Sequence, residues 1–363
     1  MPKGKGTPQT PALSCVGTGL IALDMVTNGD RGDAPRSWAG GSCGNVLTIL
    51  AYLGWHSHPV ARLGNDKPAK IITEDMGSHG VDLQHVSYDK SVHTPIIVQR
   101  ILTAPDGNPT HRFYWVCPNC GNWLPRYRPV LLREVRAISD DLPETSCFYF
   151  DRVSSAALYL AKKARDQGAL VVFEPTTIRE DAQFEKAMSI CDVLKYSNER
   201  TKNFPKSTYE SSAQMVIETL GAEGLRYRLR RNGKCGKWKL LSAFRVANLK
   251  DTAGAGDWCT AGMVDMLAKE NGVPLRCINE KKIVDALRYG QALSALNCAF
   301  EGARGSMYGL DKERFAWEVK GILARKEAET SVIDSVSHKA NLAIKCVCPV
   351  CQQTTRKRTK GKI

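Results

Sequence analysis

A glycine-rich turn between two aspartates is the feature of this 363-residue sequence that most constrains its fold. The segment Asp251-Thr-Ala-Gly-Ala-Gly-Asp257 runs directly into an apolar, helix-forming stretch at 258–267. Glycine reaches backbone conformations closed to other residues, so successive N–H groups can converge at the helix start, where the helix dipole favours an anion. A tight connection without a ligand would show a similar pattern. The flanking aspartates favour the anion site.

Asp257 stands where a phosphate would bind, and a negative carboxylate beside a phosphate is electrostatically unfavourable unless it has a catalytic role. Accepting the proton of a hydroxyl group during phosphoryl transfer is such a role. The sequence contains no GxxxxGK[ST] motif, which excludes a P-loop nucleotide site. The turn therefore predicts a phosphotransferase in which the backbone holds the phosphoryl group and Asp257 is the general base.

The rest of the chain alternates strand-like with helix-like segments, which predicts a mostly parallel sheet covered by helices. A last helix is expected over Asp311–Glu329, with Phe315, Val319 and Ile322 on its apolar side. The alternating segments are 14–23, 44–53, 148–150, 156–167 and 169–173.

Two hairpins are predicted to interrupt this pattern. Residues 94–103 and 111–116 flank a PDGNP turn, and residues 225–241 alternate basic with apolar side chains around Asn232-Gly233. Arg112, on the second strand of the first hairpin, is a candidate contact for a hydroxyl-rich or acidic substrate. Plain packing of this aromatic strand is the alternative.

The glycine-rich turn resembles the DTxGAGD signature of the PfkB (ribokinase-like) carbohydrate kinases and matches it at every fixed position. The GGSCGN segment at 40–45 is similar to the family's N-terminal signature, and TLGAEG at 219–224 resembles its nucleotide-binding strand and turn. The resemblance covers about residues 14–310. It implies a ribokinase-like three-layer α/β/α domain with a mostly parallel central sheet and a small β lid.

The resemblance also implies a role for each matching residue. Asp257 would be the general base, and the backbone of Gly254, Ala255 and Gly256 would hold the phosphoryl group of ATP. Asp251 would help to organise a site for a monovalent cation such as K⁺. Sugar hydroxyls would be bound by Asp24, Gly40, Gly41 and Asn45, and the nucleotide by Thr219, Gly221 and Gly224.

The family motif that supports Mg²⁺ is not intact. An NxxE motif starting at Asn198 requires glutamate at position 201, where the sequence has Thr201. The segment KYSNE ending at Glu199 resembles a KxSxE variant of some fructokinase-like members, which predicts magnesium support from Asn198 and Glu199. Glu174 replaces the family's more usual aspartate at a strand end.

Four of the thirteen cysteines form two CPxC pairs, Cys117–Cys120 and Cys348–Cys351. Each pair has the form of a zinc knuckle that supplies half of a tetrahedral site, so one Cys₄ zinc shared by both pairs is predicted. The C-terminal segment would then fold back onto the lid, within a subunit or across a homodimer. Cys346 is a spare ligand. Two separate pairs of reduced thiols are the alternative.

The net charge of +14 is concentrated in three segments. Residues 1–14 and 345–363 together carry +8, residues 226–239 carry +7, and the remainder is nearly neutral. A zinc ribbon followed by a basic tail is also typical of a nucleic-acid-binding or regulatory protein. Solvated charge without a partner is the favoured interpretation of these segments.

Residues 1–13 contain no apolar signal segment, and no run approaches the roughly 18 apolar residues that a membrane span needs, so a cytoplasmic protein is expected. The predicted organisation is a flexible tail at 1–13, a kinase domain at 14–310 with the lid and CPNC insertion at about 93–130, and a C-terminal extension at 311–363. The predicted function is transfer of the ATP γ-phosphoryl group to a sugar, with a nucleoside kinase of the same superfamily as the alternative.

Overall fold

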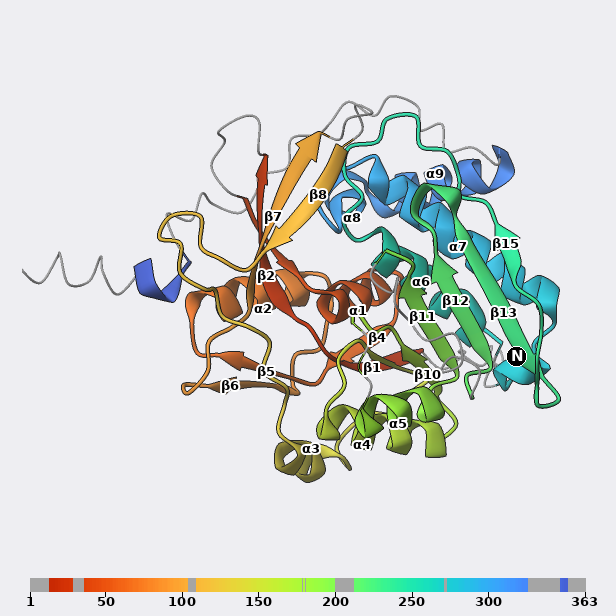
Figure 1. Ribbon diagram of the computed structural model, residues 1–363, viewed down its shortest axis with the longest axis horizontal. Helices are drawn as coiled ribbons and strands as arrows, with labels where there is room; N and C mark the ends of the chain where they lie inside the picture. Colours follow the sequence, from red (N-terminus) through yellow and green to blue (C-terminus); the bar gives the residue numbers. More distant parts are fainter. Residues whose placement is uncertain are drawn as a thin grey trace, which may run out of the picture.

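A nine-stranded, mostly parallel sheet forms the centre of the computed structural model (Figure 1). The structure describes residues 13–28, 36–103, 109–177, 179, 181–199, 212–270, 273–325 and 347–351.

The inner strands of this sheet are short and apolar on both faces, as expected where helices cover both sides. Strand β9, with the sequence CFYF, is buried at every position. The parallel part runs β4 (His56–Pro59), β1 (Ser14–Thr18), β9 (Cys147–Phe150), β10 (Leu170–Phe173), β11 (Val193–Ser197) and β12 (Met215–Thr219). The antiparallel edge is β13 (Leu225–Arg231), which pairs with β12, β14 (Lys234–Cys235) and β15 (Lys239–Leu241).

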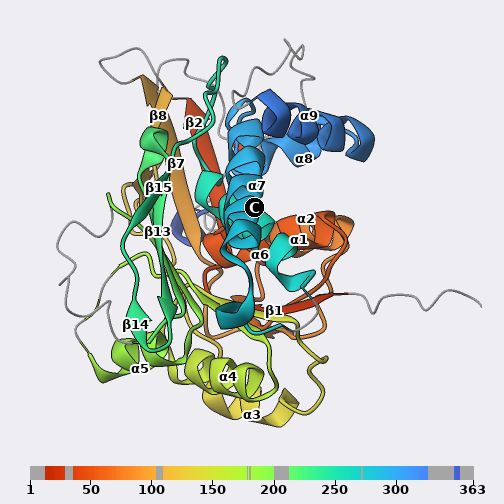
Figure 2. The ribbon, with the colours of Figure 1, turned by 90° about the vertical axis from the view of Figure 1, so that its right-hand side faces the viewer.

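Helices cover both faces of the sheet and enclose two separate hydrophobic clusters, which gives the predicted three layers (Figures 1 and 2). Side-chain caps mark several helix starts; Ser154 Oγ, for example, accepts from Ala157 N at 3.1 Å at the start of α4. One face carries α1 (Ser42–Tyr52), α6 (Ala255–Ala268), α7 (Glu280–Cys298) and α9 (Lys312–Arg325), and the other α3 (Leu132–Ile138), α4 (Ser155–Asp166) and α5 (Ala182–Ile190). Further helices in the described part of the chain are α2 (Lys67–Ser78), α8 (Gly305–Gly309), η2 (Gly221–Glu223) and η3 (Leu275–Cys277).

A separate four-stranded sheet forms the lid. Its order is β3 (Arg36–Gly40), β2 (Ala22–Asn28), β7 (Ile96–Thr103) and β8 (Pro109–Tyr114), and a two-stranded sheet joins β5 (Ala61–Gly64) to β6 (Val86–Asp89). The antiparallel β7–β8 pair confirms the first predicted hairpin, whose turn at 104–108 lies outside the described residues.

The prediction of one strand over residues 14–23 is wrong. The chain leaves the central sheet after Thr18 and enters the lid at Ala22, so Asp24 lies on lid strand β2. The break begins at Gly19, and the segments on both sides of it are buried.

The second predicted hairpin is confirmed by Asn232 and Gly233, whose φ angles of 49° and 75° suit a two-residue hairpin turn. Its basic side chains contact neighbouring groups of the same chain. Arg226 pairs with Glu218, Lys239 Nζ lies 2.7 Å from Glu280 Oε1, and Arg231 donates to two backbone carbonyls at 2.7 and 2.9 Å. The guanidinium groups of Arg226 and Arg228 each lie 4.7 Å from the Trp238 ring centre.

The C-terminal helix begins one residue after the predicted start, and Phe315, Val319 and Ile322 are buried as expected. The basic tail at 352–363, Cys346 and residues 1–12 lie outside the described residues. No helix in the described part of the chain is long and apolar enough to cross a membrane.

Candidate active site

The segment 251–257, here called the phosphoryl loop, ends in the first turn of α6. Gly254 is the N-cap residue of α6 and has a φ of 72°, in the left-handed region that favours glycine. A Cβ atom at Gly254 would lie 2.1 Å from the Ala303 carbonyl oxygen, so a side chain does not fit there. Among the described residues no side chain caps α6, and its N-terminal end therefore suits an anion.

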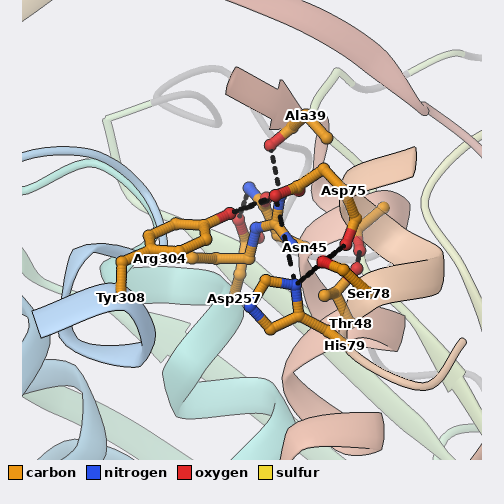
Figure 3. A network of polar contacts seen from close by, with 10 residues as sticks. Ala39, Asn45, Thr48, Asp75, Ser78, His79, Asp257, Arg304 and Tyr308 are labelled. Atoms are coloured by element: carbon orange, nitrogen blue, oxygen red, sulfur yellow. Dashed lines mark hydrogen bonds and ion pairs between the residues drawn. The ribbon is translucent and has the colours of Figure 1, made fainter. Parts of the chain in front are cut away.

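Asp257 lies in the first turn of α6 and accepts a hydrogen bond from the start of another helix. Asn45 Nδ2, on α1, donates to Asp257 Oδ2 at 2.7 Å (Figure 3). The Oδ1 atom of Asn45 is buried and has no hydrogen-bond partner in the described part of the chain. The fold thus joins two predicted site residues that are 212 positions apart.

The buried carboxylate of Asp251 holds the start of the phosphoryl loop. It accepts hydrogen bonds from Ala253 N at 2.9 Å and from Gly302 N at 3.0 Å. Gln99 Nε2, on lid strand β7, donates to both carboxylate oxygens at 3.2 and 3.4 Å. Asp251 therefore connects the loop with the lid and with the segment that follows α7.

A buried ion pair lies behind the phosphoryl loop. Lys195 Nζ, on β11, pairs with Glu174 and donates to the Gly256 carbonyl oxygen at 3.1 Å. Thr260 Oγ1 donates to Glu174 Oε2 at 2.6 Å. Burial alone would lower the pKa of Lys195, but Glu174 and other acidic neighbours outweigh it, so the pKa is raised and the ammonium group stays charged.

The residues predicted to bind the acceptor gather where β3 meets α1. A Cβ atom at Gly40 would lie 1.9 Å from Asp24 Oδ2, and Gly41 has a φ of 81°. Asp24 Oδ1 is buried and has no hydrogen-bond partner within the described ranges. Burial raises the pKa of Asp24 to about 7, although Arg304 and the Gly41 N–H act in the opposite direction.

Arg304 is a buried cation that the sequence analysis missed. Its Nη2 donates to the Ala39 carbonyl oxygen at 2.6 Å and to Asp75 Oδ2 at 2.5 Å (Figure 3). The Tyr308 hydroxyl donates to Asp75 Oδ1 at 3.0 Å. The arginine stands in a short glycine-containing connection before α8, and such a connection gives no sequence signal for a buried charge.

The residues predicted to bind the nucleotide lie where neighbouring parallel strands β11 and β12 end. Asn198 N donates to the Thr219 carbonyl oxygen at 3.0 Å, and Asn198 is followed by the exposed Glu199. Gly221 and Gly224 have φ angles of 59° and 108°, and a Cβ atom at Gly224 would lie 2.2 Å from a backbone carbonyl oxygen. Ligands of α/β sheets commonly bind at this carboxyl edge. Thr201 lies outside the described residues.

On lid strand β8, His111 rather than Arg112 contacts the phosphoryl loop. His111 Nδ1 lies 3.1 Å from Thr252 Oγ1 and 3.9 Å from Asp251 Oδ1. Arg112 is exposed and pairs in register with Arg100, and alternation along the strand directs its side chain to the other face. The strand period of two distinguishes these faces, but sequence alone does not say which one meets the loop.

The four cysteines of the two CPxC pairs meet in one cluster within the chain. The sulfur atoms of Cys117, Cys120, Cys348 and Cys351 all lie within 4.8 Å of one another. The predicted meeting of the two pairs is therefore confirmed, and residues 347–351 lie against the segment that follows the lid.

Comparison with known proteins shows which family the chain matches. The family model described as pfkB family carbohydrate kinase matches residues 11–308. The chain is 25% identical over 330 residues to the probable fructokinase-6, chloroplastic, of Arabidopsis thaliana, covering 82% of this chain and 80% of the relative. It is 26% identical over 277 residues to an ATP-dependent ribose-1-phosphate kinase of Halopiger xanaduensis, with coverage of 75% and 84%.

Solved structures share the fold. A fructokinase of Xylella fastidiosa with bound ATP matches with a TM-score of 0.63 and 21% identity, over 80% of this chain and 93% of that one. A nucleoside kinase of Burkholderia thailandensis in complex with inosine matches with a TM-score of 0.61 and 16% identity, over 86% and 97%. Both confirm the predicted ribokinase-like α/β architecture.

Proposed function

Because the chain belongs to the pfkB family of carbohydrate kinases, we propose that it transfers the γ-phosphoryl group of ATP to a hydroxyl group of a sugar. The observation that carries the proposal is the position of Asp257. The Asp257 carboxylate lies in the first turn of α6, next to the uncapped start of that helix, and accepts a hydrogen bond from the Asn45 side-chain amide. This is the arrangement that a general base beside an anion site requires.

In the proposed reaction the acceptor hydroxyl gives its proton to Asp257. The hydroxyl oxygen forms a bond to the γ-phosphorus while the bond between that phosphorus and the bridging oxygen breaks, and ADP leaves. Asn45 fixes one oxygen of the Asp257 carboxylate and so directs the other toward the acceptor. The backbone of Gly254, Ala255 and Gly256 stabilises the charge on the transferring group.

Lys195 supports this site from behind. Its ammonium group is buried, held by Glu174, and bonded to the Gly256 carbonyl oxygen. That hydrogen bond fixes the peptide that follows Gly256, whose N–H belongs to Asp257. The Lys195–Glu174 pair is thus proposed as a positioning element of the phosphoryl loop.

The site proposed for Mg²⁺ follows from an unpaired oxygen atom. Asn198 Oδ1 is buried without a hydrogen-bond partner in the described part of the chain, and with Glu199 it would support Mg²⁺ on the nucleotide. The metal would neutralise charge on the phosphates. Asp251 is proposed to organise the neighbouring loop for a monovalent cation such as K⁺.

The acceptor is proposed to bind against Asp24, Gly40, Gly41 and Asn45. Asp24 and Asn45 each have a buried carbonyl-type oxygen without a partner among the described residues, and such oxygens suit the hydroxyl groups of a sugar.

The basic hairpin gives no support to a nucleic-acid-binding function, because Arg226, Arg231 and Lys239 contact groups of the same chain.

The direct test measures ADP release over a panel of hexoses, pentoses, sugar phosphates, keto-deoxy acids and nucleosides. The Asp257→Asn variant serves as the blank and Asp285→Asn, an exposed acid of α7, as the matched control. We expect one carbohydrate class to give turnover in the wild type and the control, with none in the blank. Turnover with nucleosides alone, or equal turnover in the blank, would overturn the proposal.

A further inference from the structure

The cysteine cluster has the dimensions of a tetrahedral metal site. Cys117 Sγ lies 3.9 Å from Cys351 Sγ, and Cys120 Sγ lies 3.8 Å from Cys348 Sγ. Four sulfur ligands placed tetrahedrally at the usual Zn–S distance of about 2.3 Å are separated by about 3.8 Å. A disulfide requires a separation of about 2 Å. The spacing therefore fits four thiolates around one ion.

The backbone around the first pair has the form of a metal-binding knuckle. Cys117 N donates to the Asn122 carbonyl oxygen at 2.8 Å, and Gly121 N donates to the Cys117 carbonyl oxygen at 2.9 Å. Gly121 has a φ of 69°, which suits the glycine that follows the second cysteine. The side-chain amide of Asn122 donates to Cys120 Sγ at 3.4 Å, a contact that stabilises a sulfur ligand carrying negative charge.

Burial distinguishes this cluster from a surface pair of thiols. Cys117, Val347 and Cys348 are almost fully buried and belong to the large hydrophobic cluster of the domain. Two of the described residues 347–351 are cysteines of the cluster, and a metal ion bound there would stabilise their attachment to the segment after β8.

We propose that Cys117, Cys120, Cys348 and Cys351 of one chain bind a single structural Zn²⁺. With four protein ligands the site is closed, so the ion has no open position for a substrate or water. Binding releases the thiol protons to solvent. The ion fastens residues 347–351 to the segment after β8, and β8 in turn reaches the phosphoryl loop through His111. The zinc thereby steadies the lid.

The first experiment measures zinc in the full-length protein by elemental analysis after purification without added metal. We expect about one zinc per chain, and less than about a tenth of that in Cys348→Ser. Cys277→Ser, which changes an exposed cysteine far from the cluster in sequence, should keep the full zinc content. Protein without zinc, or Cys348→Ser with unchanged zinc, would overturn the proposal. The readout is independent of kinase activity.

A mixing experiment tests whether one chain supplies all four ligands. One double variant replaces Cys117 and Cys120 with serine, and the other replaces Cys348 and Cys351. Each should lack zinc, and a mixture of the two should also lack it. Recovery of zinc in the mixture would place the ion between chains and would refute the single-chain site. Cobalt added to the wild type should give the visible bands of a tetrahedral thiolate complex, which keeps the test valid if a variant folds poorly.

Discussion

The phosphoryl loop and the cysteine cluster are built in opposite ways. The loop consists of consecutive residues, 251–257, and its shape is set by the glycine at 254 and by backbone donors to Asp251. The cluster takes two cysteines from the segment after the lid and two from residues 347–351. A contiguous site is fixed by local backbone geometry, whereas an assembled site depends on whatever joins its parts. Changes in the loop should therefore remove chemistry, and changes in the cluster should loosen the lid.

The largest effect is expected from Asp257→Asn, which isolates the chemistry of the loop. Loss of a general base lowers kcat by about 10²–10⁴-fold. The fold should survive, because the asparagine keeps an oxygen that accepts the Asn45 amide proton. Steady-state kinetics measures kcat, and calorimetry should show nucleotide affinity close to that of the wild type. A loss of both activity and nucleotide binding would mean that Asp257 holds the fold instead.

The next effect concerns the buried pair that supports the loop. Lys195→Met leaves the Glu174 carboxylate, whose side chain is 15% exposed, without its cation, and breaking a buried pair costs about 3–5 kcal/mol of unfolding free energy. Urea unfolding measures this loss. Lys162→Met is the matched control, because Lys162 is an exposed lysine paired with Asp166 and should cost less than about 1 kcal/mol.

A double variant sharpens this test. Lys195→Met combined with Glu174→Gln removes both charges, so it should be more stable than Lys195→Met alone. Equal stability of the single and double variants would show that packing, and not the unpaired carboxylate, accounts for the loss.

A pH effect is expected from Asp24, which lies on lid strand β2. Its folded pKa of about 7 is above the ordinary value of 3.8, so the folded state binds this proton more tightly than the unfolded state. The stabilisation is full below pH 3.8 and is lost as the pH rises toward 7. From pH 5 to pH 8 the loss is on the order of 3 kcal/mol.

Asp24→Asn removes this titration, so urea unfolding at pH 5 and pH 8 should show a smaller decrease in stability for the variant than for the wild type. An exposed acid, Asp285, provides the control: Asp285→Asn should keep the wild-type pH dependence. If Asp24→Asn shows the same decrease as the wild type, the carboxylate is not the group that titrates.

The same contrast explains what the sequence could predict. The DTAGAGD segment constrains its own turn, since a φ of 72° at position 254 favours glycine; the Ala303 carbonyl, which also excludes a side chain there, comes from outside the segment. The spacing of the two CPxC pairs indicates metal-binding knuckles, so their meeting in one cluster could be predicted from the sequence. The mostly parallel sheet covered by helices was predicted from the alternation of strand-like and helix-like segments, whereas the three layers and the lid were implied by the resemblance to the PfkB family.

The residues that were missed depend on tertiary packing. Arg304 is buried only because Ala39 and Asp75, far away in sequence, supply its acceptors. His111 and Arg112 are adjacent on one strand, and the docking of the lid decides which of them meets the loop. The break between β1 and β2 coincides with Gly19, but the sequence does not show that two different sheets bury the segments on its two sides.

The smallest effect is expected from removing the proposed zinc, and it tests the contrast directly. A strong chelator should free residues 347–351 and loosen the segment after β8, so that limited proteolysis cuts the C-terminal region faster. The acceptor KM should rise by about tenfold, which corresponds to about 1.4 kcal/mol of binding free energy. The kcat should stay within a factor of about two, because Asp257 and its loop are held by Asn45, Gly302 and Lys195 and not by the cysteines. A large decrease in kcat with unchanged KM would show that the cysteine cluster also holds the phosphoryl loop, and would contradict the separation of the two sites.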